Sequence, residues 1–311
     1  MPLSTRLIKS RIKSVTSTRQ ITRAMEAVSA SKMSKAVNLV LASRPYSEEA
    51  WGLLNNIALI KKYRTMHPLL KDNKSTKKQL ILIIASDKGL CAGFNTQVFK
   101  QLSDDNYELS DFIAIGKKAI DYLAQEKVNM IASFEDLSNN LSKAKITNSV
   151  YSPSISDIRP IAKMIIDNYI KEKYNKVLLI YTDYVSALKQ IPRTLQILPI
   201  KKQDKELGFV REKHGIEKNI FTQSTVDYLF EPSISSVLDI MLPRLVEAQI
   251  YQAILESSAS EHSARMIAMK NATSSASDLI EDLLLTFNRV RQSGITSEIA
   301  EISGARMVMQ E

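Results

Sequence analysis

Glycine is scarce in this chain of 311 residues, which contains only 8 of them. None occurs before Gly52, and none occurs between Gly215 and Gly294. Because glycine is among the residues least favourable to a helix interior, both stretches favour long, uninterrupted helices. At about 1.5 Å per residue, residues 244–293 would extend roughly 75 Å and residues 3–44 roughly 60 Å. Two such helices cannot each stand alone in water, so we predict that they bury their apolar faces against each other.

Cysteine and histidine are equally rare, which excludes several kinds of site. The single Cys91 cannot form a disulfide framework within the chain, and it fits a reducing compartment. The three histidines (His67, His214 and His262) lie far apart, without cysteine or carboxylate neighbours at metal-ligand spacing. We therefore predict no metal site.

Long apolar runs are also missing. No stretch of about 18 apolar residues occurs, so we predict no membrane-spanning helix. The N-terminus lacks the apolar core of a secretory signal. Its basic composition superficially suits a transit peptide, but the helical pattern begins near residue 3 without a cleavage region. We therefore interpret this segment as mature structure and expect a cytoplasmic location.

The motifs of nucleotide sites are absent as well. The chain has neither the G-x-x-x-x-G-K-[ST] phosphate loop nor the G-x-G-x-x-G fingerprint. After the first predicted strand comes the turn SDKGLCAGFN at 86–95, in which three residues separate Gly89 from Gly93. We interpret this segment as a structural strand-to-helix turn, with phosphate binding as the alternative. No nucleophile or carboxylate has a visible acid/base partner, so we predict no active site and no cofactor.

The C-terminal stretch has the most regular pattern of the chain. Apolar or small residues recur at alternating steps of four and three, the heptad spacing of a supercoiled helix pair. Many are Ala or Met, which predicts closely spaced helix axes and a thin shaft. Ser233 is the expected helix cap, and Pro243 is expected to break or kink an early turn. These positions, the C-terminal seam, are Met241, Leu245, Ala248, Gln252, Leu255, Ala259, His262, Met266, Met269, Thr273, Ala276, Ile280, Leu283, Phe287 and Val290.

The N-terminal stretch is less regular. Its apolar residues form three triplets with steps of four and then three, but steps of six and five residues join the triplets. Such interruptions shift the phase of a supercoil, and we expect them to make the shaft asymmetric. Pro45 is expected to bend or end this helix, with a second helical piece over 47–63. The triplets are Ile8, Ile12 and Val15; Ile21, Met25 and Val28; and Met33, Val37 and Val40.

Between the long helices the periodicity changes. Short continuous apolar runs predict buried strands, and helical patterns alternate with them, so we expect a parallel α/β sheet. The predicted strands cover 80–85, 112–115, 128–132, 177–181 and 194–198. The predicted helices cover 96–102, 117–125 and 158–173, and the expected loops cover 71–78 and 201–219. The fold class is therefore a pair of long terminal helices plus a central α/β, Rossmann-like domain, with domain ranges 1–63 and 216–311 for the helical shaft and 64–215 for the central domain.

The charge is strongly positive, with a formal net charge of +9 and a pI near 9.4. Residues 1–35 contain eight lysines and arginines against Glu26 alone, so we expect an acidic partner. One alternative is a basic coiled-coil adaptor for nucleic acid, which is disfavoured because no aromatic side chain for base stacking occurs before Tyr46. Another alternative is a small-molecule enzyme built on the central domain.

Five stretches of the sequence match known motifs. They are RQITRAMEAVSASKM at 19–33, SDKGLCAGFN at 86–95, YLFEP at 228–232, EHSARMIAMKNATSSA at 261–276 and LTFNRVRQSGITSE at 285–298. The first three resemble the N-terminal signature, the S-D-R-G-L-C-G-G turn and the Y-L-[YF]-E-P motif of the gamma subunit of F-type ATP synthase, and the last two resemble its C-terminal helix. The resemblance covers nearly the whole chain.

The chain departs from the family pattern in two places. Lys88 and Ala92 replace Arg and Gly in the turn, which argues against an anion role for it. The segment EISGA at 301–305 is one residue shorter than the usual E-I-x-S-G-A, and 306–311 differ from the small apolar residues common in the family. The cysteine-bearing insertion of chloroplast forms is absent, and because we predict no transit peptide, we expect a bacterial source.

The resemblance implies a central rotor stalk, in which the terminal helices form an antiparallel coiled coil inside a ring of three alpha and three beta subunits. The central domain would contact the epsilon subunit and the membrane ring of c subunits. Rotation driven by ion flow would present different faces of the shaft to each beta subunit and so couple ion flow to ATP synthesis or hydrolysis. The implied location is peripheral, at the cytoplasmic face of the bacterial inner membrane.

The resemblance also implies which residues contact the beta subunit. Met25 matches a methionine of the bearing region, which faces an acidic loop of beta. Gln292, Thr296 and Glu298 match the segment R-Q-x-x-I-T-x-E, which contacts a second loop of beta. Arg19, Arg23 and Lys32 would face acidic groups there. Helix solvation or packing is the alternative for each. The residues are Met25, Arg19, Arg23, Lys32, Gln292, Thr296 and Glu298.

Overall fold

The structure is a computed structural model that describes residues 2–59, 67–102, 109–135, 137, 155–200, 231 and 233–308. The chain forms two compact units. Unit 1 comprises Met1–Ala30 and Arg265–Glu311, and unit 2 comprises Ser31–Ala264. The predicted domain boundaries, after residue 63 and after residue 215, lie outside the described residues.

Two long helices, α1 (Pro2–Leu59) and α6 (Ile234–Val308), confirm the expectation drawn from the scarcity of glycine. Pro45 does not end α1, which continues through it to Leu59, so the prediction of a separate second piece is wrong. A contact close to the proline holds the helix in place: Ser43 Oγ donates a hydrogen bond of 2.6 Å to Gln252 Oε1 of α6. The rest of the predicted second piece lies outside the described residues.

A break at Pro243, near the start of α6, is one of the two outcomes predicted there, and it does not occur. Pro243 lies inside the helix and does not break it. An internal proline costs a helix about 3 kcal/mol, and the burial of Leu242 and Leu245 on either side offsets this cost. The predicted cap is confirmed, because the backbone N–H of Ser236 donates to Ser233 Oγ at 3.2 Å.

The C-terminal seam is confirmed along α6. Every predicted seam position is buried or half-buried. In unit 1, residues between the seam positions are exposed, as at Leu284 and Leu285. In unit 2, Leu255 and Ala259 of the seam form a buried cluster with Ala36 and Val40 of α1. The small alanines at this contact allow the two helix backbones to approach closely.

The predicted phase shifts in the N-terminal helix are wrong. Ile21 and Val28 are 59% and 57% exposed, whereas Thr22 and Ser29 are buried. The four-three spacing therefore continues unbroken, through small polar residues that an apolar pattern does not detect. The α1 seam consists of Ile8, Ile12, Val15, Arg19, Thr22, Glu26, Ser29, Met33, Ala36 and Val40, all of them buried or half-buried.

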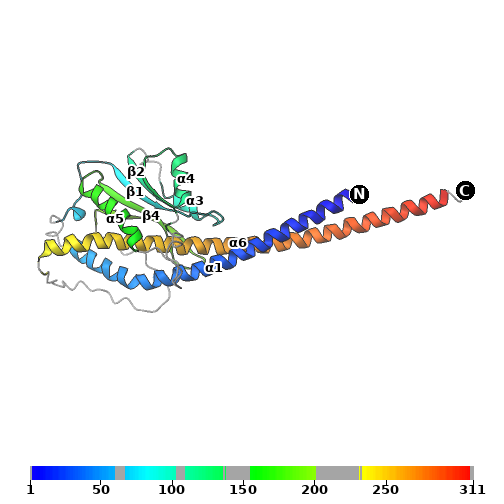
Figure 1. Cartoon of the computed structure of the whole chain (residues 1–311), viewed down its shortest axis with the longest axis horizontal. Coiled ribbons are helices and arrows are strands. Elements are labelled where there is room, and N and C mark those ends of the chain that lie inside the picture. The colour runs from blue at the N-terminus through cyan, green and yellow to red at the C-terminus, as the bar shows by residue number, and fades with distance from the viewer. Residues whose placement is uncertain are drawn as a thin grey trace. The chain divides into compact units, whose positions relative to one another are not determined.

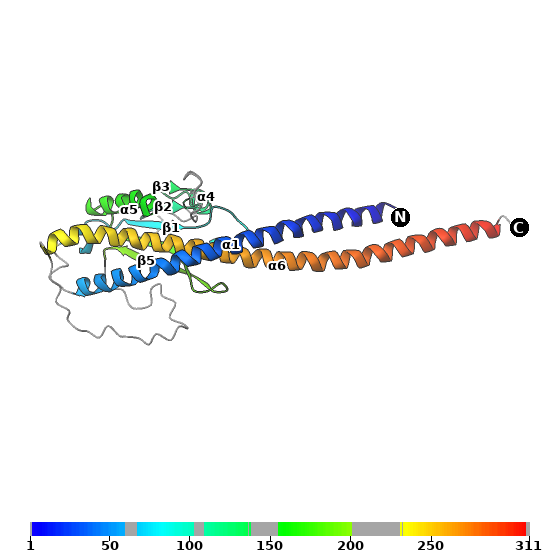
Figure 2. The same ribbon diagram turned by 60° about the horizontal axis from the view of Figure 1, so that its bottom comes forward.

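The two helices run antiparallel within each unit. In unit 1, Thr273 Oγ1 donates to Thr22 Oγ1 at 2.8 Å. In unit 2, the contact between Ser43 and Gln252 has the same direction, with later residues of α1 meeting earlier residues of α6. Figure 1 and Figure 2 both show α1 and α6 side by side. Buried polar pairs at seam positions specify the register of a coiled coil, so the expected antiparallel coiled coil is confirmed.

A five-stranded sheet in the order β3-β2-β1-β4-β5 lies in unit 2. Its strands confirm the five predicted runs: β1 (Gln79–Ile84), β2 (Ser110–Ile115), β3 (Met130–Phe134), β4 (Lys176–Tyr184) and β5 (Gln190–Leu198). Four strands are parallel, as expected. The fifth, β5, is antiparallel to β4. Only five residues join the two, and a parallel crossover requires a dozen or more.

Helices cover both faces of this sheet (Figure 1). On one face, α5 (Ile155–Ile170) and the first turns of α6 enclose a core that includes Leu82, Ile161 and Leu242. On the other face, α3 (Phe94–Phe99) and α4 (Lys117–Gln125) cover Phe112 and Ala114. The three predicted helices of the central region are thereby confirmed. A short 3-10 helix, Pro68–Leu70, precedes the sheet, and the polar stretch 71–78 contains no helix or strand, as expected.

A buried carboxylate connects the starts of four strands. Asp111 of β2 forms an ion pair of 2.7 Å with Lys78, and it accepts hydrogen bonds of 2.6 Å from Asn129 and Tyr174. Burial raises the pKa of Asp111, but the hydrogen bonds from Lys78, Tyr174 and Asn129 outweigh this effect and leave the pKa below its ordinary value. The charged group is therefore stably accommodated at this edge of the sheet.

Candidate functional site

The turn after β1 is held by its own side chains. Asn95 Oδ1 accepts hydrogen bonds from the backbone N–H and the hydroxyl of Ser86, at 3.1 and 3.0 Å. Asn95 Nδ2 in turn lies 3.4 Å from Cys91 Sγ, and the cysteine is buried. The polar groups of the turn therefore bond to one another, which supports the structural interpretation of this motif.

One departure from the family motif has a visible backbone effect. Ala92, which stands where the motif has Gly, adopts a φ of 49°. This is the left-handed region that glycine enters at no steric cost. The glycine of the motif fits this backbone conformation without strain, and this chain adopts the same conformation with alanine.

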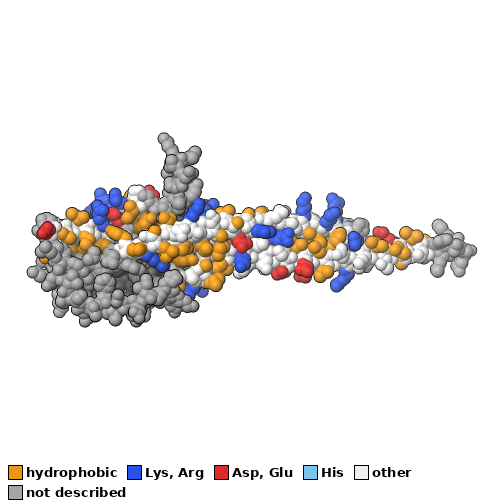
Figure 3. Space-filling view, turned by 90° about the horizontal axis from the view of Figure 1, so that it is seen from below, with side chains coloured by type: hydrophobic (Ala, Val, Ile, Leu, Met, Phe, Trp, Pro, Cys, Tyr) orange, Lys and Arg blue, Asp and Glu red, His pale blue; other side chains and the backbone are white. Residues whose placement is uncertain are grey.

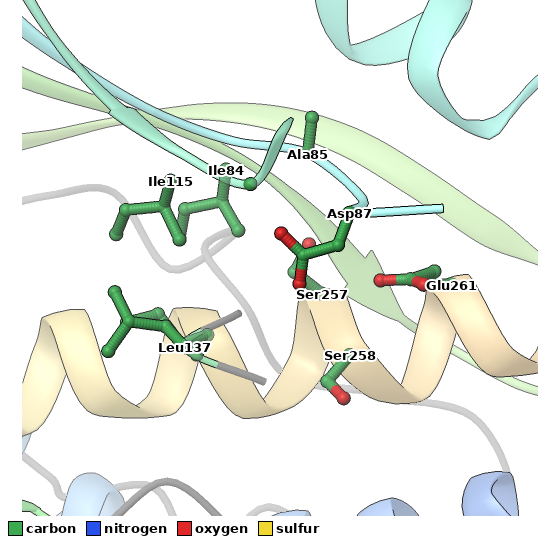
Figure 4. A pocket seen from close by; sticks show the side chains of 10 residues that line it. Ile84, Ala85, Asp87, Ile115, Leu137, Ser257, Ser258 and Glu261 are labelled. Carbon is green, nitrogen blue, oxygen red and sulfur yellow. The ribbon is translucent and has the colours of Figure 1, made fainter. Parts of the chain in front are cut away.

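Asp87 closes the carboxyl edge of the sheet. Its Oδ1 accepts a hydrogen bond of 3.1 Å from the backbone N–H of Lys117, the first residue of α4. Figure 4 shows Asp87 above a turn of α6, opposite Ser257 and Glu261. The cavity between them has a volume of about 10 Å³, which is room for about one water molecule. Sites for small molecules usually measure about 300–1,000 Å³.

The seven predicted partner-contact residues all lie on α1 or α6. Arg19 and Met25 are half-buried, and the other five are exposed. All except Lys32 belong to unit 1. Because Thr22 meets Thr273, the C-terminal group from Gln292 onward lies roughly 30 Å farther along α6 than the level of Met25. The structure thus separates the predicted residues into two groups along the helix pair.

The two groups differ in how they are presented. Gln292 and Thr296 are four residues apart and share one face of α6, whereas Glu298 lies on the opposite side. Arg19 occupies a position of the α1 seam, so its aliphatic stem packs in the helix contact. Arg23 lies one turn further along α1 and is exposed.

Sequence reasoning missed a set of exposed apolar side chains in unit 1. These residues lie outside the positions of the C-terminal seam, either between them or beyond Val290, and each is 44–70% exposed. Exposed apolar groups of this number are typical of a surface that a partner covers. The available signal was the presence of apolar residues outside the heptad positions: Leu279, Leu284, Leu285, Ile295, Ile299 and Ile302.

Basic side chains are exposed on the same unit. Figure 3 shows lysines and arginines among apolar side chains along the helix pair, with carboxylates at separate places between them. In unit 1, the exposed basic residues of α1 are Arg6, Lys9, Arg11, Lys13 and Arg23. Unit 1 therefore presents a mixed apolar and positively charged surface.

Two further kinds of site are not formed by the described residues. None of them makes a group of three or more potential metal ligands. No helix in the described ranges is long and apolar enough to cross a membrane.

Comparison with known proteins identifies the family. A family model described as ATP synthase matches residues 4–307. The ATP synthase gamma chain of Pelotomaculum thermopropionicum is 37% identical over 310 residues, which cover 99% of each chain. The chain belongs to the ATP synthase gamma family. A second gamma chain, from Fusobacterium nucleatum, is 38% identical over 96% of each chain.

Solved structures agree with this assignment at the level of the fold. A chain of the Euglena gracilis mitochondrial ATP synthase has a TM-score of 0.65 at 18% identity, with 99% of this chain and 95% of that chain covered. A chain from the rotor of the same enzyme has a TM-score of 0.61 at 16% identity, with 95% and 100% covered. As a gamma subunit, the chain is a non-catalytic rotor component of the central stalk of F-type ATP synthase. This confirms the rotor hypothesis.

Proposed function

We propose that unit 1 is the part of the rotor that contacts the ring of three alpha and three beta subunits. In this proposal, the helix pair of 1–63 and 216–311 is the shaft, and the domain of 64–215 contacts the epsilon subunit and the ring of c subunits. The chain has no active site of its own. It associates peripherally, through the complex, with the cytoplasmic face of the bacterial inner membrane.

One observation supports the proposal most strongly. The described part of unit 1 consists of two helices that bury only their mutual seam, and it leaves apolar and basic side chains exposed along the outside. A helix pair without further cover is an extended surface for a partner. The predicted contact residues lie on this surface: Met25, Arg19 and Arg23 on α1, and Gln292, Thr296 and Glu298 on α6, with Lys32 just beyond in unit 2.

Coupling by such a shaft requires unequal contacts. A rotor drives its partners through their states only if its contact free energy differs between those states. Because the seam of α1 is unbroken, the outward side chains supply the differences between one side of the shaft and another.

Reconstitution tests whether this chain has an active site of its own. We expect the isolated chain to show no ATP hydrolysis above buffer, and we expect a mixture with alpha and beta subunits to form a complex that hydrolyses ATP. The measurement is phosphate release after size separation of the complex. Sustained hydrolysis by the isolated chain, retained through further purification, would contradict the proposal.

Met25→Lys tests the contact with beta. The added ammonium would create a new charged contact with an acidic loop and change the contact free energy by about 1 kcal/mol, enough to alter occupancies severalfold. We expect a lower ATP yield for a given ion gradient in membrane vesicles.

Ala27→Lys is the matched control for this variant. Ala27 is exposed and lies two residues further on, on the opposite side of α1. The Ala27→Lys variant adds the same charge to the same helix. Equal ATP yields from Met25→Lys and the unmodified complex would refute the proposed role of Met25.

A further inference from the structure

Two carboxyl groups face each other inside unit 2. Glu256 of α6 is 2% exposed, and Asp183 near the end of β4 is 1% exposed. Their side chains are within hydrogen-bonding range of each other. Two carboxylates in such proximity and burial repel each other strongly, so pairs of this kind retain a proton.

The surrounding hydrogen bonds leave one position for that proton. Arg193 Nε donates to Asp183 Oδ2 at 2.9 Å, so Arg193 forms an ion pair with Asp183. Its other oxygen, Oδ1, is buried, and no N–H or hydroxyl of the described residues donates to it. Gln252 Nε2 donates to Glu256 Oε1 at 2.8 Å, which leaves the second oxygen of Glu256 to hold the proton.

The charged and titratable groups around Glu256 come from three elements besides α6. They are Arg44 on α1, Asp183 and Tyr181 on β4, and Arg193 on β5. Burial, first of all, and then Asp183 raise the pKa of Glu256 to about 8, whereas Gln252 and Arg44 act in the opposite direction. Glu256 is therefore protonated at neutral pH.

We propose that the protonated carboxyl group of Glu256 donates a hydrogen bond to Oδ1 of Asp183, and that this pair is a proton-dependent latch between α6 and the sheet. The latch extends to α1, because Gln252 also accepts the 2.6 Å hydrogen bond from Ser43. It thus joins the helix pair of unit 2 to β4, and β4 is bonded to the antiparallel edge strand through Arg193.

Release of the proton to solvent would open the latch. It would remove the hydrogen bond and place two negative charges side by side where one cation, Arg193, already pairs with the first. The joint between helices and sheet would loosen in alkaline solution. In a rotor, this joint would make the helix pair and the sheet of unit 2 turn together.

The sign of the pH effect follows from linkage. The folded chain holds a proton on Glu256 up to about pH 8, whereas an ordinary glutamate releases it near its reference value of 4.5. The contribution of Glu256 to stability is complete below a pH of 4.5 and falls as the pH rises from there toward about 8. Above that pH it falls no further. Within this window, the unfolding equilibrium constant should rise about tenfold per pH unit through this group.

The test compares the full chain with Glu256→Gln by urea unfolding at several pH values between 5 and 9, values chosen to span the window at roughly one-unit steps. Glutamine can donate to Asp183 and accept from Gln252, but it cannot ionise. We expect the variant to lose about a tenfold change per pH unit from the pH dependence. Glu281→Gln, an exposed change on the same helix, should keep the original dependence.

An infrared measurement decides the case even if the variant does not fold. A protonated carboxyl group has a C=O band that a carboxylate lacks. We expect this band in the unmodified chain at neutral pH, with loss of its intensity at pH values above the pKa of Glu256. Absence of the band at neutral pH, or equal pH dependence in Glu256→Gln and the unmodified chain, would overturn the latch.

Discussion

Val40→Asp is expected to lower the free energy of unfolding by about 4 kcal/mol, because it places a carboxylate in a fully buried helix contact. Val40 has no exposed surface, and its cluster contains Ala36, Leu255 and Ala259. The apolar neighbours offer no hydrogen bond to the new charge, so the two helices should separate at this level. The melting temperature should fall by roughly 10 °C for a chain of this size.

The neighbouring residue provides a matched control. Leu41 is 53% exposed, so Leu41→Asp introduces the same charge one residue further along the same helix without burying it. We expect its stability to remain within about 0.5 kcal/mol of the unmodified chain. In assembled complexes, Val40→Asp should also reduce ion pumping per ATP hydrolysed. Equal melting temperatures for the two variants would show that the contact of α1 with α6 does not hold the helices together.

Gly116→Ala is expected to cost more than about 3 kcal/mol. Gly116 lies between β2 and α4 with a φ of 94°, and a Cβ there would overlap the carbonyl oxygen of Ala85. Neither segment can move away, because Ala85 N–H donates to Ile115 O at 2.9 Å and Gly116 N–H donates to Phe134 O at 2.8 Å. Circular dichroism against urea concentration would measure the loss.

Gly89→Ala separates steric overlap from the general effect of replacing a glycine. A Cβ at Gly89 would meet no atom within 4 Å. We expect this variant to unfold at nearly the same urea concentration as the unmodified chain, since its backbone need not shift. If Gly116→Ala were as stable as Gly89→Ala, the close approach of the chain at Ala85 would be wrong.

Much of the fold could be predicted because its patterns are local. Heptad spacing and the lack of glycine predicted α6 and its buried positions from Met241 to Val290. Continuous apolar runs such as 80–85 predicted the strands. The motif at 19–33 identified the family, but the roles of Met25 and its fellow contact residues remain predictions, since they depend on partners.

The failures have a common physical cause, which is tertiary contact. Thr22 and Ser29 are polar in sequence, yet they fit a narrow helix contact better than Ile21 and Val28, which face outward. An apolar pattern therefore misread the phase of α1. Strand direction at β5 required attention to the length of its connection rather than to its composition.

The buried acid pair could not be predicted from spacing. Asp183 and Glu256 lie 73 positions apart, and neither local sequence indicates that the two side chains meet. Only the fold brings them together and removes them from water. The charge state of a buried group depends on the packed structure around it, so it cannot be predicted from the spacing of residues in the sequence.

The uninterrupted α1 seam has a consequence for how such chains diverge. The residues that hold the two helices together, such as Thr22, Ala36 and Val40, are separate from those that point outward, such as Arg23 and Gln292. A regular backbone therefore lets the outer surface be exchanged without rebuilding the scaffold. Chimeras that transplant only outward positions between distant species should assemble, and their performance would report on surface chemistry alone.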